Sequence, residues 1–318
     1  MSSFVPGWLQ KQSINLCMAA NLREIGEHKG RSELNCVQSL TIVDALRNMT
    51  AEHSAAAAAR LEGIENPVEQ ANYGKLLLEV QGKYARFPVR ATTILAMHAG
   101  LFQGTGVPAG QCRNGESLMA VESLCENYCR QEGLMDPVLL TGAFVFDFYS
   151  LQPFAQGNER TAQLLASWLL QKQDYCVSRF VSLERIMEET KTEYAEALND
   201  SSVGWHASRH DMGPWWSYWL GILVKAYRTF TARTLVLAKR RGVKTDLILN
   251  AMKAMPDGFT LRQIQQQLPG CGIELIRKIC KAEKAAGRIR CMGRGPNTLW
   301  RVKRKHETAA KSEPEEKY

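Results

Sequence analysis

The sequence lacks the features of a membrane or secreted protein. No stretch approaches about 18 uninterrupted apolar residues, the length that a transmembrane helix needs. The first ten residues do not have the basic-then-apolar order of a secretory signal. With 45% hydrophobic and 23% charged residues, and no enrichment in proline or glycine, the 318-residue chain has the composition of a globular protein with two or three domains.

The cysteines also lack a recognisable framework. They are nine in number, which is odd, and no two of them form a CxxC pair, since Cys125 and Cys129 lie four residues apart. This pattern argues against a disulfide scaffold and against a structural zinc site. We therefore expect a protein of the reducing cytoplasm, with no membrane partner.

Alternation of apolar and polar residues, the mark of a strand, is scarce before residue 285. Apolar residues recur instead at helical spacing, and Val138–Leu151 and Thr161–Leu170 are apolar enough to predict buried helices. Ser39–Glu62 is a further long helical candidate. The predicted fold class is therefore mainly α.

Charge is distributed very unevenly. Residues 244–306 carry 14 Lys and Arg against 4 Asp and Glu, whereas the first 243 residues carry 24 of each sign. The formal net charge of +8 thus comes from one C-terminal segment, which follows the basic linker Ala238–Lys244. Such an asymmetry predicts a separate domain that faces a polyanion.

The basic segment has the outline of a winged helix-turn-helix domain. Turns around Pro256 and Pro269 separate three short helical patterns, and a Gly-rich loop then joins two short strands. The predicted helices are Asp246–Met255, Thr260–Gln267 and Ile273–Ala286, and the predicted strands are Arg288–Met292 and Thr298–Val302.

The third of these helices predicts a nucleic-acid contact. Its basic residues recur at i, i+4 and i+7, while Leu275, Ile279 and Ala286 form another face suited to core contact. One basic face and a basic wing are what insertion into a DNA groove requires. The predicted DNA-binding residues are Arg277, Lys278, Lys281, Lys284, Arg288, Arg290 and Arg294. A domain used for protein contacts is the alternative.

The segment between Gln152 and Gln163 predicts an anion-binding turn. Gly157 and Asn158 permit unusual backbone angles, a helix begins directly after them, and Arg160 adds a positive charge. An ordinary turn without a ligand remains the alternative from spacing alone.

The same segment resembles the motif of the Fic (Fido) family, His-Pro-Phe-x-Asp/Glu-Gly-Asn-Gly-Arg-x-x-Arg, which lies between two helices. The resemblance covers roughly residues 50–230 and implies a helical core that transfers AMP from ATP to a protein hydroxyl with the help of magnesium. The residues that carry it are Pro153, Phe154, Gly157, Asn158, Arg160 and Thr161, with Gly204–His206 and His210–Trp215 beyond them.

The departures from this motif fall on the positions that the resemblance assigns to chemistry. Gln152 replaces the catalytic His, and an amide cannot act as a general base near neutral pH. Gln156 replaces the carboxylate that holds magnesium, a cation that prefers carboxylate ligands. Glu159 puts a negative charge where phosphate would approach, and Gln163 replaces the Arg that grips the outer phosphates.

Many relatives also carry an inhibitory helix with the pattern Ser/Thr-x-x-x-Glu-Gly/Asn. The segment that ends at Glu62 and Gly63 resembles it, although Ala58 replaces the Ser or Thr. In the family this Glu pairs with the last Arg of the motif. Because that position is Gln163 here, the sequence predicts that Glu62 forms no ion pair.

Two further groups have structural explanations. His206 and His210 have the i, i+4 spacing of a metal pair, but no acidic or Cys ligands surround them, so we expect them to hold helix ends. The tryptophans and tyrosine between Trp205 and Trp219 could stack a base, but core packing is the preferred explanation.

Together these observations predict a mainly α protein: a Fic-type helical core with an N-terminal inhibitory-type helix, followed by a small winged helix-turn-helix domain. The predicted parts are residues 1–83, 84–236, 237–306 and a tail at 307–318. The first hypothesis is a catalytically impaired relative of the protein adenylyltransferases that regulates through DNA. An active AMP-transferase with a non-standard motif is the second, and an antitoxin-like or dimerising interaction module is the third. DNA is the expected partner, a protein partner or a homodimer stays open, and ATP and magnesium are expected only if the family activity is retained.

Overall fold

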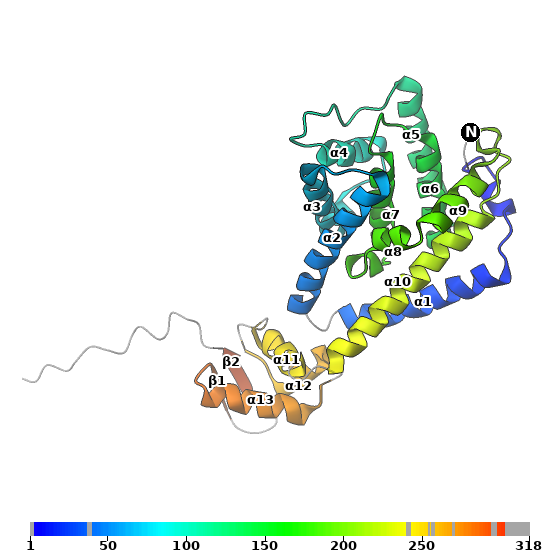
Figure 1. Cartoon of the computed structure of the whole chain (residues 1–318). Helices are drawn as coiled ribbons and strands as arrows, with labels where there is room; N and C mark the ends of the chain where they lie inside the picture. The colour runs from blue at the N-terminus through cyan, green and yellow to red at the C-terminus, as the bar shows by residue number, and fades with distance from the viewer. Residues whose placement is uncertain are drawn as a thin grey trace, which may run out of the picture. The chain divides into compact units, whose positions relative to one another are not determined.

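The computed structural model describes residues 3–36, 40–239, 243–253, 255, 258–268, 271–293 and 298–302. The chain divides into two compact units (Figure 1). Unit 1 comprises Met1–Glu33 with Ile42–Ala232, and unit 2 comprises Leu34–Thr41 with Arg233–Tyr318. The predicted separation of residues 1–83 from 84–236 falls inside unit 1.

Helices make up nearly all the regular structure up to Lys239, which confirms the mainly α prediction. They are α1 Leu16–Cys36, α2 Leu40–Glu62, α3 Pro67–Lys83, α4 Ala91–Leu101, α5 Gly115–Gln131, α6 Pro137–Leu151, α7 Asn158–Lys172, α8 Leu183–Glu189, α9 Lys191–Ser202 and α10 Gly213–Lys239. Short 3-10 turns lie at Leu9–Lys11, Tyr84–Arg86, Val177–Arg179 and Trp205–Ala207.

Helices α6 and α7 form the centre of unit 1 and pack against each other, and α7 also packs against α3 and α4 (Figure 1). The side chain of Asp136 begins α6 by accepting hydrogen bonds from the backbone N–H groups of Val138 and Leu139, and Pro137 occupies the first helical turn, where no N–H is needed. Residues 138–148 and 160–171 are buried throughout, as the apolar runs predicted.

The tryptophans of α10 pack in the core, which confirms the preferred explanation for them. Their indole N–H groups donate to backbone carbonyls of α6: Trp215 to Gly142 at 2.8 Å, Trp216 to Leu139 at 3.1 Å and Trp219 to Val138 at 2.9 Å. These bonds satisfy the polar atom of each buried ring. They also hold α10 close to the helix that leads into the 152–163 loop.

This close approach predicts a stability effect. A Cβ added at Gly142 would lie 2.7 Å from Cδ1 of Trp219. We therefore expect Gly142→Ala to lower the free energy of unfolding by about 1–3 kcal/mol, because the indole cannot move without losing its hydrogen bond. Gly221 in α10 is exposed with no atom within 4 Å of an added Cβ. Gly221→Ala should thus raise stability by about 0.5–1 kcal/mol. Thermal denaturation that ranks the two variants in the opposite order would contradict this packing.

Unit 2 has the predicted order of elements: α11 Val243–Lys253, α12 Leu261–Gln267, α13 Ile273–Ala285, β1 Ile289–Met292 and β2 Leu299–Val302. The strands pair antiparallel, with Ile289 opposite Val302. Thr260 and Gln263 form a capping box that begins α12, as its predicted capping role requires. That this arrangement acts as a winged helix-turn-helix stays a prediction.

The inner face of α13 differs in part from the predicted one. Ile276, Ile279 and Cys280 lie in the buried cluster of unit 2, together with Phe259 and Trp300. Leu275 is only partly buried, and Ala286 is exposed. The prediction was wrong for Ala286 because α13 ends at Ala285, so the 3.6-residue period does not extend to it.

Among the described residues, no helix is both long and apolar enough to cross a membrane. No group of three or more His, Cys, Asp or Glu side chains in this part of the chain is placed to hold a metal ion. The cysteines at positions 17, 112, 125, 129, 176, 271, 280 and 291 are free thiols.

Candidate functional site

The loop between α6 and α7 turns on two left-handed residues. Gln152 ends α6 with φ 47° and ψ 56°, and Gly157 precedes α7 with φ 72°. The side chain of Gln152 folds back and donates from Nε2 to the carbonyl of Tyr149 at 2.8 Å. The residue at the position of the family base is therefore bound to its own helix end.

Asn158 closes the loop from the inside. Its Oδ1 accepts from the backbone N–H of Phe154 at 2.9 Å, and its Nδ2 donates to the carbonyl of Phe154 at 2.8 Å. Thr161 Oγ1 donates to the carbonyl of Gly157 at 2.7 Å. All these groups are buried, so the loop is held in shape by the protein itself.

His98 of α4 also holds this loop, although no sequence pattern identified it. Its Nε2 lies 3.0 Å from the carbonyl of Gln156, and its Nδ1 accepts from the backbone N–H of Gly110 at 2.9 Å. The ring stacks on Phe154 with 3.7 Å between ring centroids. Burial lowers the pKa of His98, which favours the neutral ring with its proton on Nε2.

Arg160 is the centre of charge in the site, and it is 1% exposed. Its Nε donates to Glu62 at the end of α2, and its Nη2 lies 2.8 Å from Oε2 of Glu69 in the first turn of α3. The ring of Phe102 lies 5.4 Å from the guanidinium carbon. The prediction that Glu62 has no ion pair was wrong, because Arg160 lies within its reach in place of the missing Arg at position 163.

Glu159, the residue beside Arg160, adds another negative charge. Burial raises the pKa of its carboxyl group and the charge of Glu62 raises it further, while a hydrogen bond with Tyr194 lowers it. The carboxylates of Glu62, Glu69 and Glu159 thus outnumber the single positive charge of Arg160. Such a balance disfavours a phosphate group, which would bring two or more further negative charges.

The surface of Gly157 that faces α4 is filled. A Cβ added there would lie 2.8 Å from the ring of Phe102 and 3.3 Å from Leu101. Gly157 is required both by its positive φ and by this close approach. Gln163 is 4% exposed, and neither polar atom of its side chain has a hydrogen-bond partner among the described residues. The position of the family's phosphate-gripping Arg is therefore enclosed.

The residues present do not fit a magnesium ion with bound ATP. The side chain of Gln156 is exposed and offers only a neutral amide, while the backbone carbonyl of Gln156 is hydrogen-bonded to His98. The carboxylates nearby are engaged: Glu62 and Glu69 with Arg160, and Glu159 with Tyr194. Magnesium needs near-octahedral oxygen ligands, usually with one or two carboxylates.

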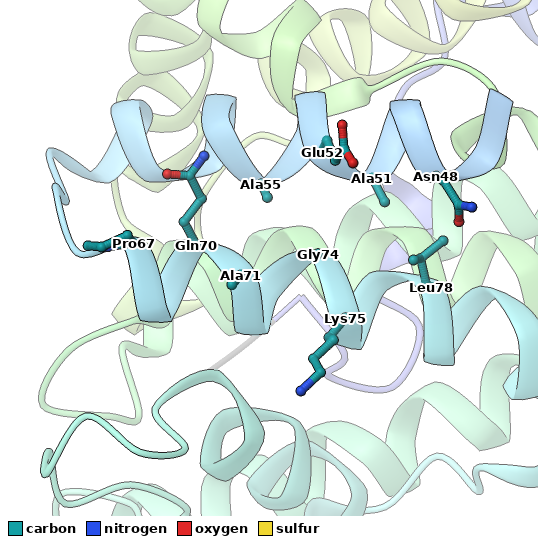
Figure 2. A pocket seen from close by; sticks show the side chains of 10 residues that line it. All are labelled: Asn48, Ala51, Glu52, Ala55, Pro67, Gln70, Ala71, Gly74, Lys75 and Leu78. Atoms are coloured by element: carbon teal, nitrogen blue, oxygen red, sulfur yellow. The ribbon is translucent and has the colours of Figure 1, made fainter. Parts of the chain in front are cut away.

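Neither of two cavities in unit 1 is lined by the predicted nucleotide-binding residues 157–160 or by Gln163, although the second cavity is lined by Gln152. A groove of about 580 Å³ runs between α2 and α3, where small residues such as Ala51, Ala55 and Gly74 line its walls (Figure 2). A smaller pocket of about 230 Å³ lies beside Gln152 and is lined in part by His206. His210 is buried, and its Nε2 lies 2.9 Å from the Ser3 hydroxyl.

The predicted DNA-contact residues occupy the outer face of α13 and the first strand of unit 2. Lys278, Lys281 and Lys284 are exposed, opposite the buried Ile276 and Ile279. The other predicted contacts differ from these lysines. Arg277 pairs with Glu274, Arg288 donates to Glu283 at 2.6 and 2.7 Å, Arg290 is exposed on β1, and Arg294 lies outside the described residues.

Comparison with known proteins agrees with this architecture. Residues 88–170 match the sequence model of the Fic/DOC family. A Fic family protein from Desulfovibrio desulfuricans G20 is 17% identical and aligns over 92% of this chain and 98% of its own, with a TM-score of 0.56. No curated protein matches the chain in sequence.

Two further solved structures have the same fold. A Fic domain-containing signaling protein from Bacteroides thetaiotaomicron VPI-5482 is 15% identical over 65% of this chain and 95% of its own, with a TM-score of 0.54. Fic-1 from C. elegans (residues 134–508) is 18% identical over 69% and 73%, with a TM-score of 0.53. The chain therefore matches the Fic/DOC family model over residues 88–170 and has the helical fold of solved Fic family proteins.

Proposed function

We propose that the Fic domain of this chain does not transfer AMP, and that the protein acts as a DNA-binding regulator through unit 2. The observation that carries the first part is the state of Arg160, whose guanidinium is held between Glu62 and Glu69. A nucleotide phosphate would have to displace the partly buried carboxylate of Glu62 and the buried carboxylate of Glu69 to reach it. The remaining chemical positions support the same conclusion.

The residue at the position of the family base cannot remove a proton from a target hydroxyl. The amide of Gln152 cannot accept a proton near neutral pH, and its Nε2 is bonded to the carbonyl of Tyr149. His98 also contacts this loop, but it is 2% exposed and both ring nitrogens are engaged with backbone groups. A histidine in that state cannot reach a hydroxyl of another protein.

We expect no adenylylation of the protein itself or of a target protein when the purified chain is incubated with labelled ATP and magnesium. Loss of a general base alone reduces the rate by about 10²–10⁴-fold. A calorimetric titration with ATP, with and without magnesium, should likewise show no binding in the micromolar range. Arg160→Ala is the control, because it removes the only retained positive charge of the motif.

Strong labelling of the wild-type protein that disappears in Arg160→Ala would overturn the proposal. The chain would then be an AMP-transferase with a non-standard motif. The observation that favours this second candidate is the pair of hydrogen bonds between Asn158 and Phe154, which hold the 152–163 loop in shape.

The second part of the proposal rests on the charge and burial pattern of α13. Three exposed lysines lie on one side of this helix, and apolar residues on the other side pack into the core of unit 2. A positively charged helix supported by a small core suits contact with the phosphates that line a DNA groove. A surface for protein contacts, including a second copy of the chain, is the outcome if DNA does not bind.

A further inference from the structure

Glu69 lies outside both the 152–163 loop and the segment that matches the family model. It is 6% exposed and is fixed from two sides. Its Oε2 lies 2.8 Å from Nη2 of Arg160, and its Oε1 accepts from Nδ2 of Asn66 at 3.1 Å. Asn66 is itself fixed, because its Oδ1 accepts from the backbone N–H of Val68 at 2.9 Å.

Glu62 reaches the same guanidinium from a different helix. It is the last residue of α2, whereas Glu69 lies in the first turn of α3, and only residues 63–66 separate the two helices. The two carboxylates use different nitrogens of Arg160, Nε for Glu62 and Nη2 for Glu69.

The charges show what the loss of one carboxylate would do. With both present, the buried Arg160 is surrounded by a net negative charge. If Glu62 is neutralised, Arg160 still forms an ion pair with Glu69, and this pair is neutral as a whole. A buried cation that keeps one partner has no excess charge to attract a phosphate.

We propose that Glu69 is a second, independent lock on Arg160, so that a diphosphate or triphosphate group can bind at the start of α7 only when both carboxylates are released. This inference rests on the proposal that the nucleotide site is closed in the wild-type protein. Glu62 and Glu69 flank the short connection between α2 and α3. A joint displacement of the end of α2 and the start of α3 would therefore release both carboxylates from Arg160.

The test measures binding of pyrophosphate to the full-length protein by calorimetry, without magnesium. Glutamine replaces each glutamate with nearly the same shape and no charge. We expect no detectable binding for the wild type, for Glu62→Gln or for Glu69→Gln. The double variant should bind at least about tenfold more tightly than either single variant. Arg160→Ala in the double variant should abolish that binding.

Glu65→Gln is the matched control, because Glu65 is exposed and lies in the same connection between α2 and α3. It removes the same charge without touching Arg160. Binding in the Glu65→Gln variant, or equal binding by Glu62→Gln and the double variant, would overturn the proposal. A folded double variant that does not bind would overturn it as well.

The double variant leaves a buried arginine without a partner and could fail to fold. Glu62→Gln combined with Glu69→Asp is the second variant for that case, since it keeps one charge but shortens the side chain that reaches Nη2. It should bind pyrophosphate more tightly than Glu62→Gln alone, and equal binding would contradict the lock at Glu69. The readout is anion affinity and not AMP transfer, so labelling of the wild type would refute the proposed function separately.

Discussion

DNA binding by the full-length protein is expected to weaken on the order of 10²-fold when the salt concentration is raised fourfold. Contacts between lysine side chains and phosphates release counterions, so log K falls with log salt by about 0.9 for each contacted phosphate. About four contacts are expected, from the exposed lysines of α13 and the basic residues of β1 and the wing. Fluorescence anisotropy with a labelled duplex at several salt concentrations measures the slope.

The lysines of α13 should account for most of this slope. Lys281→Ala should reduce it by about one and weaken binding to all sequences alike, because a phosphate contact does not depend on the base. The triple change of Lys278, Lys281 and Lys284 to Ala should remove most of the binding. A triple change of the exposed Lys11, Lys75 and Lys83 of unit 1 removes the same charge and should leave the slope unchanged.

The arginines should contribute differently from the lysines. Arg277 and Arg288 are engaged with Glu274 and Glu283, so a phosphate would have to compete with a carboxylate for each of them. If Arg277 near the start of α13 reaches a base edge, Arg277→Ala should change sequence preference. Binding that is absent at low salt, or that does not respond to salt, would make unit 2 a protein-contact module.

The second large effect concerns a buried carboxylate on α6. Asp147 is 1% exposed and accepts three hydrogen bonds. The backbone N–H of Ser3 donates to Oδ2 at 2.8 Å, while the Ser3 hydroxyl and Nε1 of Trp205 donate to Oδ1 at 2.6 and 2.8 Å. His210 Nε2 lies 2.9 Å from the Ser3 hydroxyl. Asp147 thus ties residues at the N-terminal end of the described chain to the core.

Asp147→Ala is expected to lower the thermal midpoint of unit 1 by at least about 6 °C, the product of the lower limits for three buried donors. Each buried donor left without an acceptor costs about 1–3 kcal/mol, and in a unit of this size 1 kcal/mol corresponds to about 2–4 °C. Ser3→Ala removes only one of the three donors and should cost less. Differential scanning calorimetry measures both, and a midpoint of Asp147→Ala equal to that of the wild type would contradict the role of this cluster.

The pH dependence of stability follows from the same cluster. Burial raises the pKa of Asp147 to about 6, although its hydrogen bonds act to lower the pKa. The contribution of Asp147 to the free energy of unfolding is therefore present at low pH and is lost as the pH rises through about 6. Burial lowers the pKa of His210 to about 4, so its contribution is present above its unfolded pKa and is lost as the pH falls toward 4.

Between pH 6.5 and pH 4 these two contributions oppose each other. Asp147→Asn removes the contribution of Asp147 to stability and leaves that of His210. The thermal midpoint of this variant should therefore fall more steeply than that of the wild type as the pH is lowered from 7 to 5. A parallel pH profile for the two proteins would contradict the titration of Asp147 in this window.

The helical class and the order of elements in unit 2 were predictable from the sequence because they depend on local patterns. Apolar runs predicted that α6 and α7 are buried, and Thr260 predicted the start of α12. The Fic resemblance likewise rests on residues that are close together in the chain, from Pro153 to Thr161. What the sequence by itself determined is therefore the fold class and the resemblance to the Fic motif, with other residue types at the positions that the motif assigns to chemistry.

Only the tertiary structure determined which charged side chains of the site pair with one another. Glu62 pairs with Arg160, 98 positions later in the chain, whereas the motif placed the partner of this glutamate at position 163, which is Gln163 here. Glu69, His98 and Asp147 carry no sequence signal, because their roles depend on the packing of α3, α4 and α6 against distant segments. A guanidinium pairs with whichever carboxylate the helix packing brings within reach, and the spacing along one helix cannot determine that choice.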